Sequence, residues 1–268
     1  MNTFKIAAVQ LKFSKKPDVL LKSVKKFIAL AKAKDVKIVC FPEDTFYSGA
    51  KKNKKLIEQV QKTCKEQRMW VILAAHLHER TRAYNTAVLI NDRGEISGIH
   101  KKVHLYDDPH IKAGSKFNVY KTPFCKIGIA ICWDVSCPES IRAMVKKGAM
   151  IIFCPMVWGY EDWAYHKGLK KIESEIKLLK SLILTRAFEN QVYLVFCNQY
   201  DTKRKDLIPY SLIAEPHKII KEIYKKEGMI ITDIDLDHIE EVRKRYMKEC
   251  KWDLLEKIKK LKKKKRGK

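Results

Sequence analysis

The sequence predicts an α/β fold with mixed β-sheets, and three observations lead to this prediction. Short apolar runs typical of buried strands alternate with segments whose apolar residues recur every three or four positions, as in amphipathic helices. Hairpin signals interrupt that alternation, most clearly Asp92-Arg93-Gly94 between two strand-like runs. No Pro-, Gly- or Ser-rich linker divides the 268 residues. The alternation favours parallel pairing and the hairpins favour antiparallel pairing, so the sheets should be mixed.

The elements of the N-terminal half each have a local reason. A buried strand at 4–10 precedes an amphipathic helix at 17–34, and Pro17 suits the first turn of that helix because no N–H is needed there. Gly94 supplies the positive φ that the hairpin turn needs. The other elements predicted in this half are strands at 37–41, 70–75, 85–91 and 95–102 and a helix at 54–67.

The C-terminal half repeats the alternation and ends in a strongly charged segment. We predict strands at 126–132, 149–155, 192–198, 210–214, 219–224 and 229–235, and helices at 138–147, at about 165–190 and from about 237. Because no linker is found, we expect one domain over residues 1–250, followed by a basic C-terminal tail over residues 251–268.

The charge of the chain is strongly positive, but it does not define a nucleic-acid-binding module. The net charge is +25, and removal of the nine Lys and Arg residues of 257–268 would still leave +16. The excess is therefore spread over the surface, and no zinc-finger spacing, aromatic RNP run or basic zipper is found. We interpret it as a solvated surface. Weak, non-specific contact of the tail with anions or nucleic acid is left as an alternative.

The cysteine pattern and hydropathy predict a cytoplasmic protein. No stretch reaches the roughly 18 apolar residues of a membrane span, and the N-terminus lacks the features of a signal peptide. The eight cysteines show no metal-ligand spacing, and several lie inside apolar strand-like runs. We therefore expect reduced cysteines that are mostly small core residues, with Cys132 as the exception.

Three segments place reactive side chains where apolar strands end. Glu43 follows such a run in Phe41-Pro42-Glu43-Asp44, Lys102 lies in residues 100–105 (HKKVHL), and Cys132 ends the run of residues 128–132. A free thiol is only a few per cent thiolate at neutral pH, so a neighbouring carboxylate is needed to take its proton. A lysine can stabilise the oxyanion that forms when the thiol attacks a carbonyl group. An acid, an amine and a thiol together predict thiol-dependent acyl transfer.

These segments resemble the signature motifs of the nitrilase superfamily, the carbon–nitrogen hydrolases. FPED at 41–44 resembles the glutamate motif, HKKVHL at 100–105 the lysine motif, and GIAICWDVSCPE at 128–139 the cysteine motif. RAFENQVYLVFCN at 186–198 and the strand from Tyr210 to Pro216 are similar to further family segments. The resemblance runs from about residue 4 to about residue 245 and implies Glu43, Lys102 and Cys132 as the catalytic residues.

The resemblance also implies the architecture and the reaction. The fold would be a four-layer α-β-β-α sandwich with mixed β-sheets, usually assembled as a homodimer or higher homo-oligomer, with no metal and no organic cofactor. The substrate would be a small amide or N-carbamoyl amine. The backbone N–H of Trp133 is expected as a second oxyanion donor, because it follows the nucleophile on the same turn. Trp158 lies where the family has a residue that lines the substrate pocket.

Several alternatives stay open at this stage. A nitrile substrate or a non-catalytic basic binding protein on the same fold would fit the same motifs. Lys101 stands where the family usually has Arg, so the catalytic role goes to Lys102. We expect His104 to be a hydrogen-bonded structural residue and not the partner of Cys132.

Four further acidic or basic residues receive structural expectations, and one family feature is missing. Asp134 and Glu139 are expected to fix the turn after Cys132 and to cap the helix that begins at Pro138, and Arg186 is expected to pair with Glu189. The second glutamate of many family members is absent from the loop after the lysine motif. Asp107 and Asp108 are the residues that could replace it.

Overall fold

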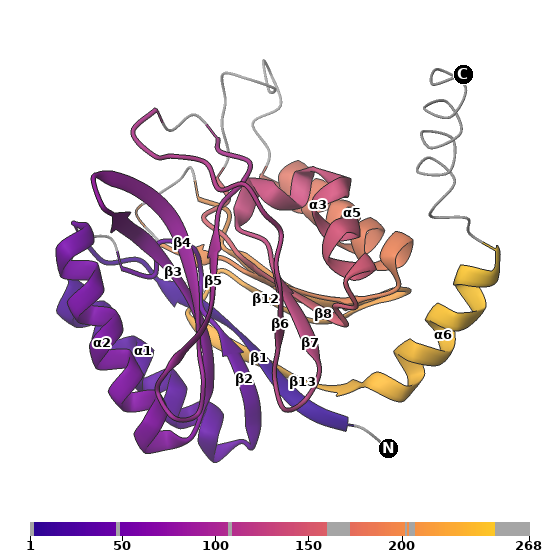
Figure 1. The fold of residues 1–268 in the computed structure, drawn as a ribbon, viewed down its shortest axis with the longest axis horizontal. Helices are drawn as coiled ribbons and strands as arrows, with labels where there is room; N and C mark the ends of the chain where they lie inside the picture. Colours follow the sequence, from indigo (N-terminus) through magenta and orange to yellow (C-terminus); the bar gives the residue numbers. More distant parts are fainter. Residues whose placement is uncertain are drawn as a thin grey trace, which may run out of the picture.

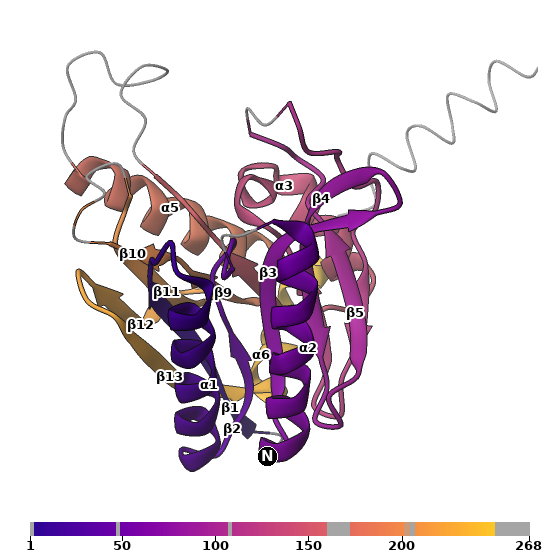
Figure 2. The same ribbon diagram turned by 90° about the vertical axis from the view of Figure 1, so that its left-hand side faces the viewer.

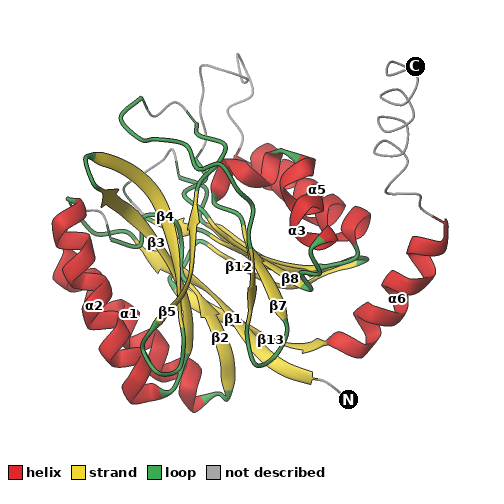
Figure 3. Cartoon of the chain, in the orientation of Figure 1, coloured by secondary structure: helices red, strands yellow, loops and turns green. Residues whose placement is uncertain are grey.

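Two β-sheets lie face to face in the computed structural model, and each carries helices on its outer face (Figure 1). The structure describes residues 3–46, 49–106, 109–159, 172–201, 203 and 207–249. Helices α1 (Pro17–Ala33) and α2 (Ala50–Gln67) cover one sheet side by side (Figure 2). Helices α3 (Pro138–Lys146) and α5 (Ile172–Asn190) cover the other (Figure 3). The four-layer α-β-β-α sandwich expected from the sequence is thereby confirmed.

The first sheet is mixed, as the hairpin signals predict. Its strand order is β10-β1-β2-β3-β4-β5, and β13 also pairs with β1. Strands β1, β2 and β3 are parallel to one another, whereas β3, β4 and β5 form an antiparallel meander and β13 is antiparallel to β1. The strands are β1 (Thr3–Lys12), β2 (Val36–Cys40), β3 (Trp70–Glu79), β4 (Arg82–Ile90), β5 (Ile96–Lys101), β10 (Gln199–Tyr200) and β13 (Gly228–Asp235).

The second sheet is also mixed, with the strand order β12-β11-β9-β8-β7-β6. Its centre, β7, β8 and β9, is parallel, and each edge is antiparallel. The strands are β6 (Val119–Lys121), β7 (Lys126–Ile129), β8 (Ile151–Pro155), β9 (Tyr193–Cys197), β11 (Tyr210–Glu215) and β12 (Lys218–Tyr224). Helix α6 (Leu236–Glu249) follows β13 at the end of the sandwich, where Arg243 donates to the carbonyl oxygens of Ala149 and Gln191 (Figure 1).

The alternation of side chains along the strands produces two apolar cores. In β2, Ile38 and Cys40 belong to the core between the sheets, while Val39 belongs to the core under α1 and α2. Successive residues of a strand point to opposite faces, so both faces of this central strand must be apolar. This is why the buried strands of the sequence are nearly continuous apolar runs and not alternating ones.

The differences from the sequence prediction include two element boundaries and one strand. Helix α2 begins at Ala50 and not at residue 54, because its first turn is rich in lysine and carries little apolar periodicity. Strand β7 ends at Ile129 and not at residue 132, so Cys132 starts a short 3₁₀ helix, η1 (Cys132–Ser136). Strand β6 was not predicted, because three half-buried or exposed residues give no period to detect.

Some predictions concern residues outside the described ranges. These are Asp107 and Asp108, the first part of the helix predicted at 165–190, and the basic tail at 251–268. The division of the chain at residue 250 therefore stays a prediction. Within the described ranges, no helix is both long enough and apolar enough to cross a membrane.

Candidate active site

The three candidate catalytic residues come from both sheets and meet at one cavity. Glu43 lies three residues beyond the end of β2, Lys102 directly follows β5, and Cys132 lies three residues beyond β7. All three line a cavity of about 490 Å³, a volume within the usual range for small-molecule sites. Glu43 and Lys102 belong to the first sheet and Cys132 to the second, so the packing of the two sheets brings them together.

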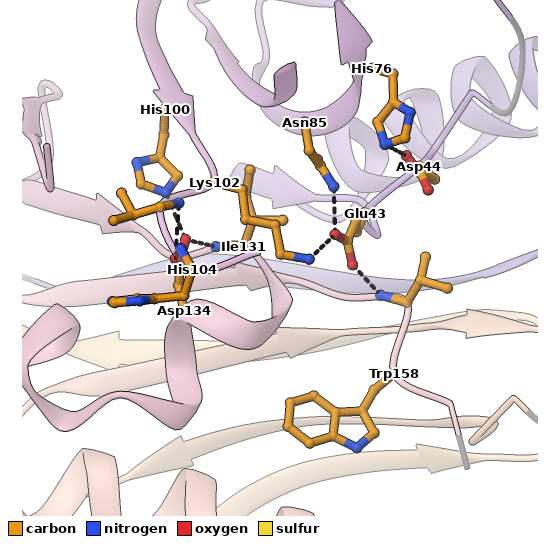
Figure 4. Close-up of polar contacts among 12 residues, drawn as sticks. Glu43, Asp44, His76, Asn85, His100, Lys102, His104, Ile131, Asp134 and Trp158 are labelled. Atoms are coloured by element: carbon orange, nitrogen blue, oxygen red, sulfur yellow. Dashed lines mark hydrogen bonds and ion pairs between the residues drawn. The ribbon is translucent and has the colours of Figure 1, made fainter. Parts of the chain in front are cut away.

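Glu43 is held in place by donors from three separate segments (Figure 4). Its Oε1 accepts hydrogen bonds from Lys102 Nζ at 2.8 Å and from Asn85 Nδ2 at 2.6 Å, and its Oε2 accepts one from the backbone N–H of Val157 at 2.8 Å. The Glu43 residue is only 3% exposed. A buried carboxylate is stable only when paired and hydrogen-bonded, and this one is both. The carboxylate is therefore fixed in one orientation beside the cavity.

Lys102 is the buried lysine of the Lys101-Lys102 pair, as the sequence assignment required. Burial alone would lower the pKa of Lys102, but its electrostatic interactions with Cys132 and Glu43 and its hydrogen bond to Glu43 outweigh burial and hold the pKa above its ordinary value. Its backbone N–H donates to the carbonyl oxygen of Asn85 at 2.9 Å, which ties it to β4. The Lys101 ammonium lies elsewhere, on Glu79 and above the ring of Tyr84. The site therefore has a permanently charged ammonium group next to the carboxylate.

Cys132 lies at a sharp backbone turn between β7 and η1. Its φ angle is +46°, a left-handed conformation that costs a non-glycine residue roughly 1–2 kcal/mol. Such local strain is typical of functional residues held by their surroundings. Burial raises the pKa of the Cys132 thiol, and so do the charge of Glu43 and a hydrogen bond to its carboxylate, while Lys102 opposes these effects. The thiol is thus protonated at neutral pH, with a carboxylate in place to receive its proton.

Asp134 connects the turn that carries Cys132 to the segment that carries Lys102. Its Oδ2 accepts the backbone N–H of Ile131 and contacts His100 Nε2, each at 3.0 Å. Its Oδ1 accepts the backbone N–H of Val103 at 3.1 Å and that of His104 at 2.8 Å (Figure 4). Asp134 therefore fixes the turn, as expected.

The expectation that acidic side chains cap the helix at Pro138 is wrong for Asp134. Residue Cys137 precedes α3 and makes no side-chain capping hydrogen bond. Asp134 is occupied by the donors of the lysine segment, so it cannot reach the helix start. Glu139 lies in the first turn of α3, where a negative charge is favourable to the helix dipole.

His104 is a structural residue, and it is absent from the described lining of the cavity. Its ring stacks on Phe117 with the centroids 5.8 Å apart, and Phe117 also stacks on His100. His104 donates its backbone N–H to Asp134, so its structural role is confirmed, although the hydrogen bond comes from the backbone and not from the ring as expected. A Cys–His dyad with Cys132 is not supported.

Trp133 and Trp158 both line the cavity; the sequence predicts this for Trp158, whereas for Trp133 it predicts a backbone oxyanion donor. Their ring centroids are 5.5 Å apart, and Tyr106 packs on the other side of Trp133 at 4.8 Å. Asn198 fixes the backbone of Trp158, because its side chain accepts the Trp158 N–H at 3.0 Å and donates to the Trp158 carbonyl at 3.1 Å. These aromatic rings form one continuous wall next to Cys132.

The ion pair expected between Arg186 and Glu189 is confirmed, with 3.1 Å between Nη1 and Oε1. The same guanidinium group donates to the carbonyl oxygens of Val135 at 3.0 Å and Ser136 at 2.9 Å. Both carbonyl groups belong to η1. Arg186 thus braces the turn after Cys132 from helix α5, a role that the sequence analysis did not foresee.

Several residues around the cavity were missed from the sequence. The structure adds polar side chains and apolar side chains to the site: Asp44, His76, Asn85, Glu175, Leu105, Ile111, Val157 and Leu178. Asn85 alone had a usable signal, since an asparagine inside a buried strand needs a hydrogen-bond partner. Across the described part of the chain, no three His, Cys, Asp or Glu side chains converge as metal ligands would.

Comparison with known proteins identifies the family. The family model described as carbon–nitrogen hydrolase matches residues 5–244 of the chain. Because the match covers most of the sequence, it assigns the chain to the nitrilase superfamily, a class of α/β sandwich enzymes. The chain belongs to the carbon–nitrogen hydrolase family, which confirms the resemblance seen in the three motifs.

Individual relatives agree with the family assignment. The chain is 33% identical to "Probable nitrilase C965.09" of Schizosaccharomyces pombe over 61% of its own length and 57% of that protein, so it spans little more than half of this relative. It is 31% identical to an N-carbamoylputrescine amidase of Arabidopsis thaliana, over 75% of this chain and 72% of that protein. It is 26% identical to an omega-amidase of Xenopus tropicalis, over 91% and 92% respectively.

The fold of a solved structure confirms the architecture. A carbon–nitrogen hydrolase from Helicobacter pylori superimposes with a TM-score of 0.84, covering 96% of this chain and 98% of that one. The sequence identity is 18%, so this likeness concerns the fold alone. The layers and sheet order described above are thus those of a known enzyme fold.

Proposed function

We propose that this protein hydrolyses the carbon–nitrogen bond of a small amide or N-carbamoyl amine through a thioester on Cys132. The observation that carries the proposal is the position of Glu43, fixed by Lys102, Asn85 and the Val157 N–H beside the thiol in one cavity. A carboxylate, an ammonium group and a thiol in that arrangement contain every group that acyl transfer needs.

The first half of the reaction forms the thioester. Cys132 Sγ attacks the substrate carbonyl carbon as Glu43 takes the thiol proton, which gives a tetrahedral oxyanion. Because the resting thiol is protonated, the proton transfer accompanies the attack and does not precede it. Glu43 then gives the proton to the leaving nitrogen, the C–N bond breaks, and ammonia or an amine departs.

The oxyanion is stabilised by Lys102 and, as a second donor, by the backbone N–H of Trp133. The Lys102 ammonium stays charged throughout the cycle, since its pKa lies above the ordinary lysine value. Preorganised donors of this kind each lower the barrier by about 3–4 kcal/mol. Trp133 and Trp158 exclude water from one side of the reacting carbon.

The second half of the reaction releases the acid. Glu43, again deprotonated, takes a proton from a water molecule, which attacks the thioester carbon. The C–S bond then breaks and the sulfur recovers its proton. An amide gives a carboxylic acid, and an N-carbamoyl amine gives a carbamic acid that decomposes to an amine and carbon dioxide. No cofactor enters this sequence of steps.

The names of the relatives favour amide or carbamoyl substrates, and they keep a nitrile as the second candidate. Two of the three relatives described above are named amidases and one is named a nitrilase. A nitrile would be attacked at its carbon by the same thiol and would pass through a thioimidate. We further expect a cytoplasmic homodimer or higher homo-oligomer, with at most weak anion or nucleic-acid contact by the basic tail.

The test is ammonia release from a panel of small amides, N-carbamoyl amines and nitriles. The wild type is compared with Cys132→Ala and with a control, Cys125→Ala, which removes a half-buried cysteine outside the described cavity lining. We expect the wild type and the control to be active, Cys132→Ala to be inactive, and the thioester mass to appear on Cys132. Inactivity of the wild type on the whole panel, with Cys132 unreactive toward an alkylating probe, would leave the non-catalytic binding protein as the better explanation.

A further inference from the structure

A buried carboxylate, Glu175, lies on the wall of the same cavity as Cys132. It comes from helix α5, in the second sheet's helical layer, and the residue is 5% exposed. Its Oε1 accepts the indole N–H of Trp158 at 2.8 Å, which fixes the carboxylate next to the aromatic wall. The reaction proposed above gives Glu175 no role, and no sequence motif pointed to it.

The basic groups among the described lining residues already face carboxylates. Lys102 is paired with Glu43 at 2.8 Å, and His76 lies 3.4 Å from Asp44. No arginine is among the described residues of the lining. Among the described lining residues, a substrate carboxylate would therefore meet three carboxylates, Glu43, Asp44 and Glu175, and no cation that is not already paired. Like charges at such short range disfavour binding.

The aromatic wall of the cavity favours the binding of cations. Trp158 and Trp133 stand 5.5 Å apart and Tyr106 extends the row, so several ring faces border the cavity. Ring faces attract cations, most strongly when the ring is that of tryptophan and the site is partly dry. A carboxylate fixed to the edge of Trp158 adds an ionic partner at the same place. Both features, which are independent of each other, fit a substituted ammonium group.

We propose that Glu175 makes the site prefer substrates whose end remote from the scissile bond carries an amine over those whose remote end carries a carboxylate. This rests on the proposed hydrolysis and names the substrate class within it. The strong positive charge of the chain as a whole does not reverse the preference. Surface charges are screened over about 8 Å at physiological ionic strength, whereas Glu175 acts inside the cavity itself.

The experiment uses three substrates of matched length: N-carbamoyl-1,4-diaminobutane, the neutral N-carbamoylbutylamine and N-carbamoyl-4-aminobutanoate. For each, kcat/KM is measured from ammonia release with the full chain. We expect the wild type to cleave the amine faster than the carboxylate. Glu175→Gln should lower the amine-to-carboxylate ratio by at least about tenfold, the size of a charge contact in a binding site, and should change the neutral substrate little.

Glu173→Gln is the matched control, because Glu173 lies in the same helix and is exposed. It should leave the ratio unchanged. A wild type that prefers the carboxylate, or a ratio that Glu175→Gln does not move, would overturn the proposal. Failure of the wild type on all three substrates and on simple amides would instead contradict the proposed hydrolysis, so the two failures are distinguishable.

A second measurement keeps the proposal testable if Glu175→Gln does not fold. Wild-type hydrolysis of the neutral substrate is inhibited with 1-aminobutane and, separately, with butanoate. The proposal expects the amine to be the stronger competitive inhibitor. Stronger inhibition by butanoate would refute it without any variant.

Discussion

The buried pair formed by Glu43 and Lys102 leads to the sharpest prediction, which concerns stability as well as activity. Both side chains are less than a tenth exposed, and 2.8 Å separates Lys102 Nζ from Glu43 Oε1. In Lys102→Met the carboxylate stays buried without its cation. Removing one partner of such a pair typically costs about 3–5 kcal/mol. Asn85 and the Val157 N–H still donate to Glu43, so we expect about 3 kcal/mol, the lower end of that range.

The double variant separates the charge effect from the loss of packing. In Glu43→Gln with Lys102→Met, neither charge remains, and the glutamine oxygen can still accept the N–H of Val157 or the amide of Asn85. We expect it to be more stable than Lys102→Met alone, with a coupling free energy of about 2 kcal/mol between the two sites. All variants that lack Lys102 should nevertheless be inactive, because the oxyanion donor is missing.

The assay is urea unfolding at neutral pH followed by tryptophan fluorescence and circular dichroism, with kcat/KM measured on the same samples. Lys101→Met is the control, since this neighbouring lysine lies at the surface on Glu79. Its unfolding midpoint and activity should stay close to those of the wild type. If the two single substitutions proved additive in the double variant, Glu43 and Lys102 would not be energetically coupled, and the account of the site as a buried ion pair would be refuted.

Two further predictions concern the thiol and its turn. The charge of Glu43 contributes to the raised pKa of Cys132, so Glu43→Gln should shift the pH dependence of Cys132 alkylation to lower pH. Mass spectrometry of the modified peptide measures this shift. An unchanged or higher midpoint would contradict the charge interaction between Glu43 and Cys132. Asp134→Asn replaces an acceptor of three backbone N–H groups by an amide that can repel them, so the free energy of unfolding should fall by about 3 kcal/mol and kcat should fall with it. Urea unfolding checks the second prediction, and a loss below about 1 kcal/mol would mean that Asp134 does not hold the turn.

The fold and the three central residues could be predicted because their signals are local. Apolar runs identify buried strands, and a reactive residue just past such a run lies at the end of that strand. Glu43, Lys102 and Cys132 all follow this rule, and the structure places all three on one cavity. The boundary at Cys132 was less accurate, since the apolar residues Ala130 and Ile131 continue the strand pattern after the strand has ended.

The rest of the site depends on contacts between residues far apart in the chain. Val157 contributes only its backbone N–H to Glu43, and every residue type has one, so no sequence pattern marks it. In the sequence, Glu175 is one of several charged residues of a helix, and only the packing of α5 against Trp158 sets it apart. Arg186 was matched with Glu189 because they lie three residues apart, whereas its contacts to η1 span about fifty residues.

The resting charge state of the site follows from this assembly between two sheets. One ammonium and one carboxylate neutralise each other inside the protein, which leaves no net charge to support a thiolate. Burial therefore raises the pKa of the Cys132 thiol and keeps it protonated in the resting enzyme, before a substrate binds. In the proposed reaction, Lys102 loses its carboxylate partner when Glu43 takes that proton, at the moment an oxyanion forms. The Lys102 ammonium would then interact with the oxyanion in place of the carboxylate, so in the proposed mechanism the pair stabilises the transition state more than the resting enzyme, as catalysis requires.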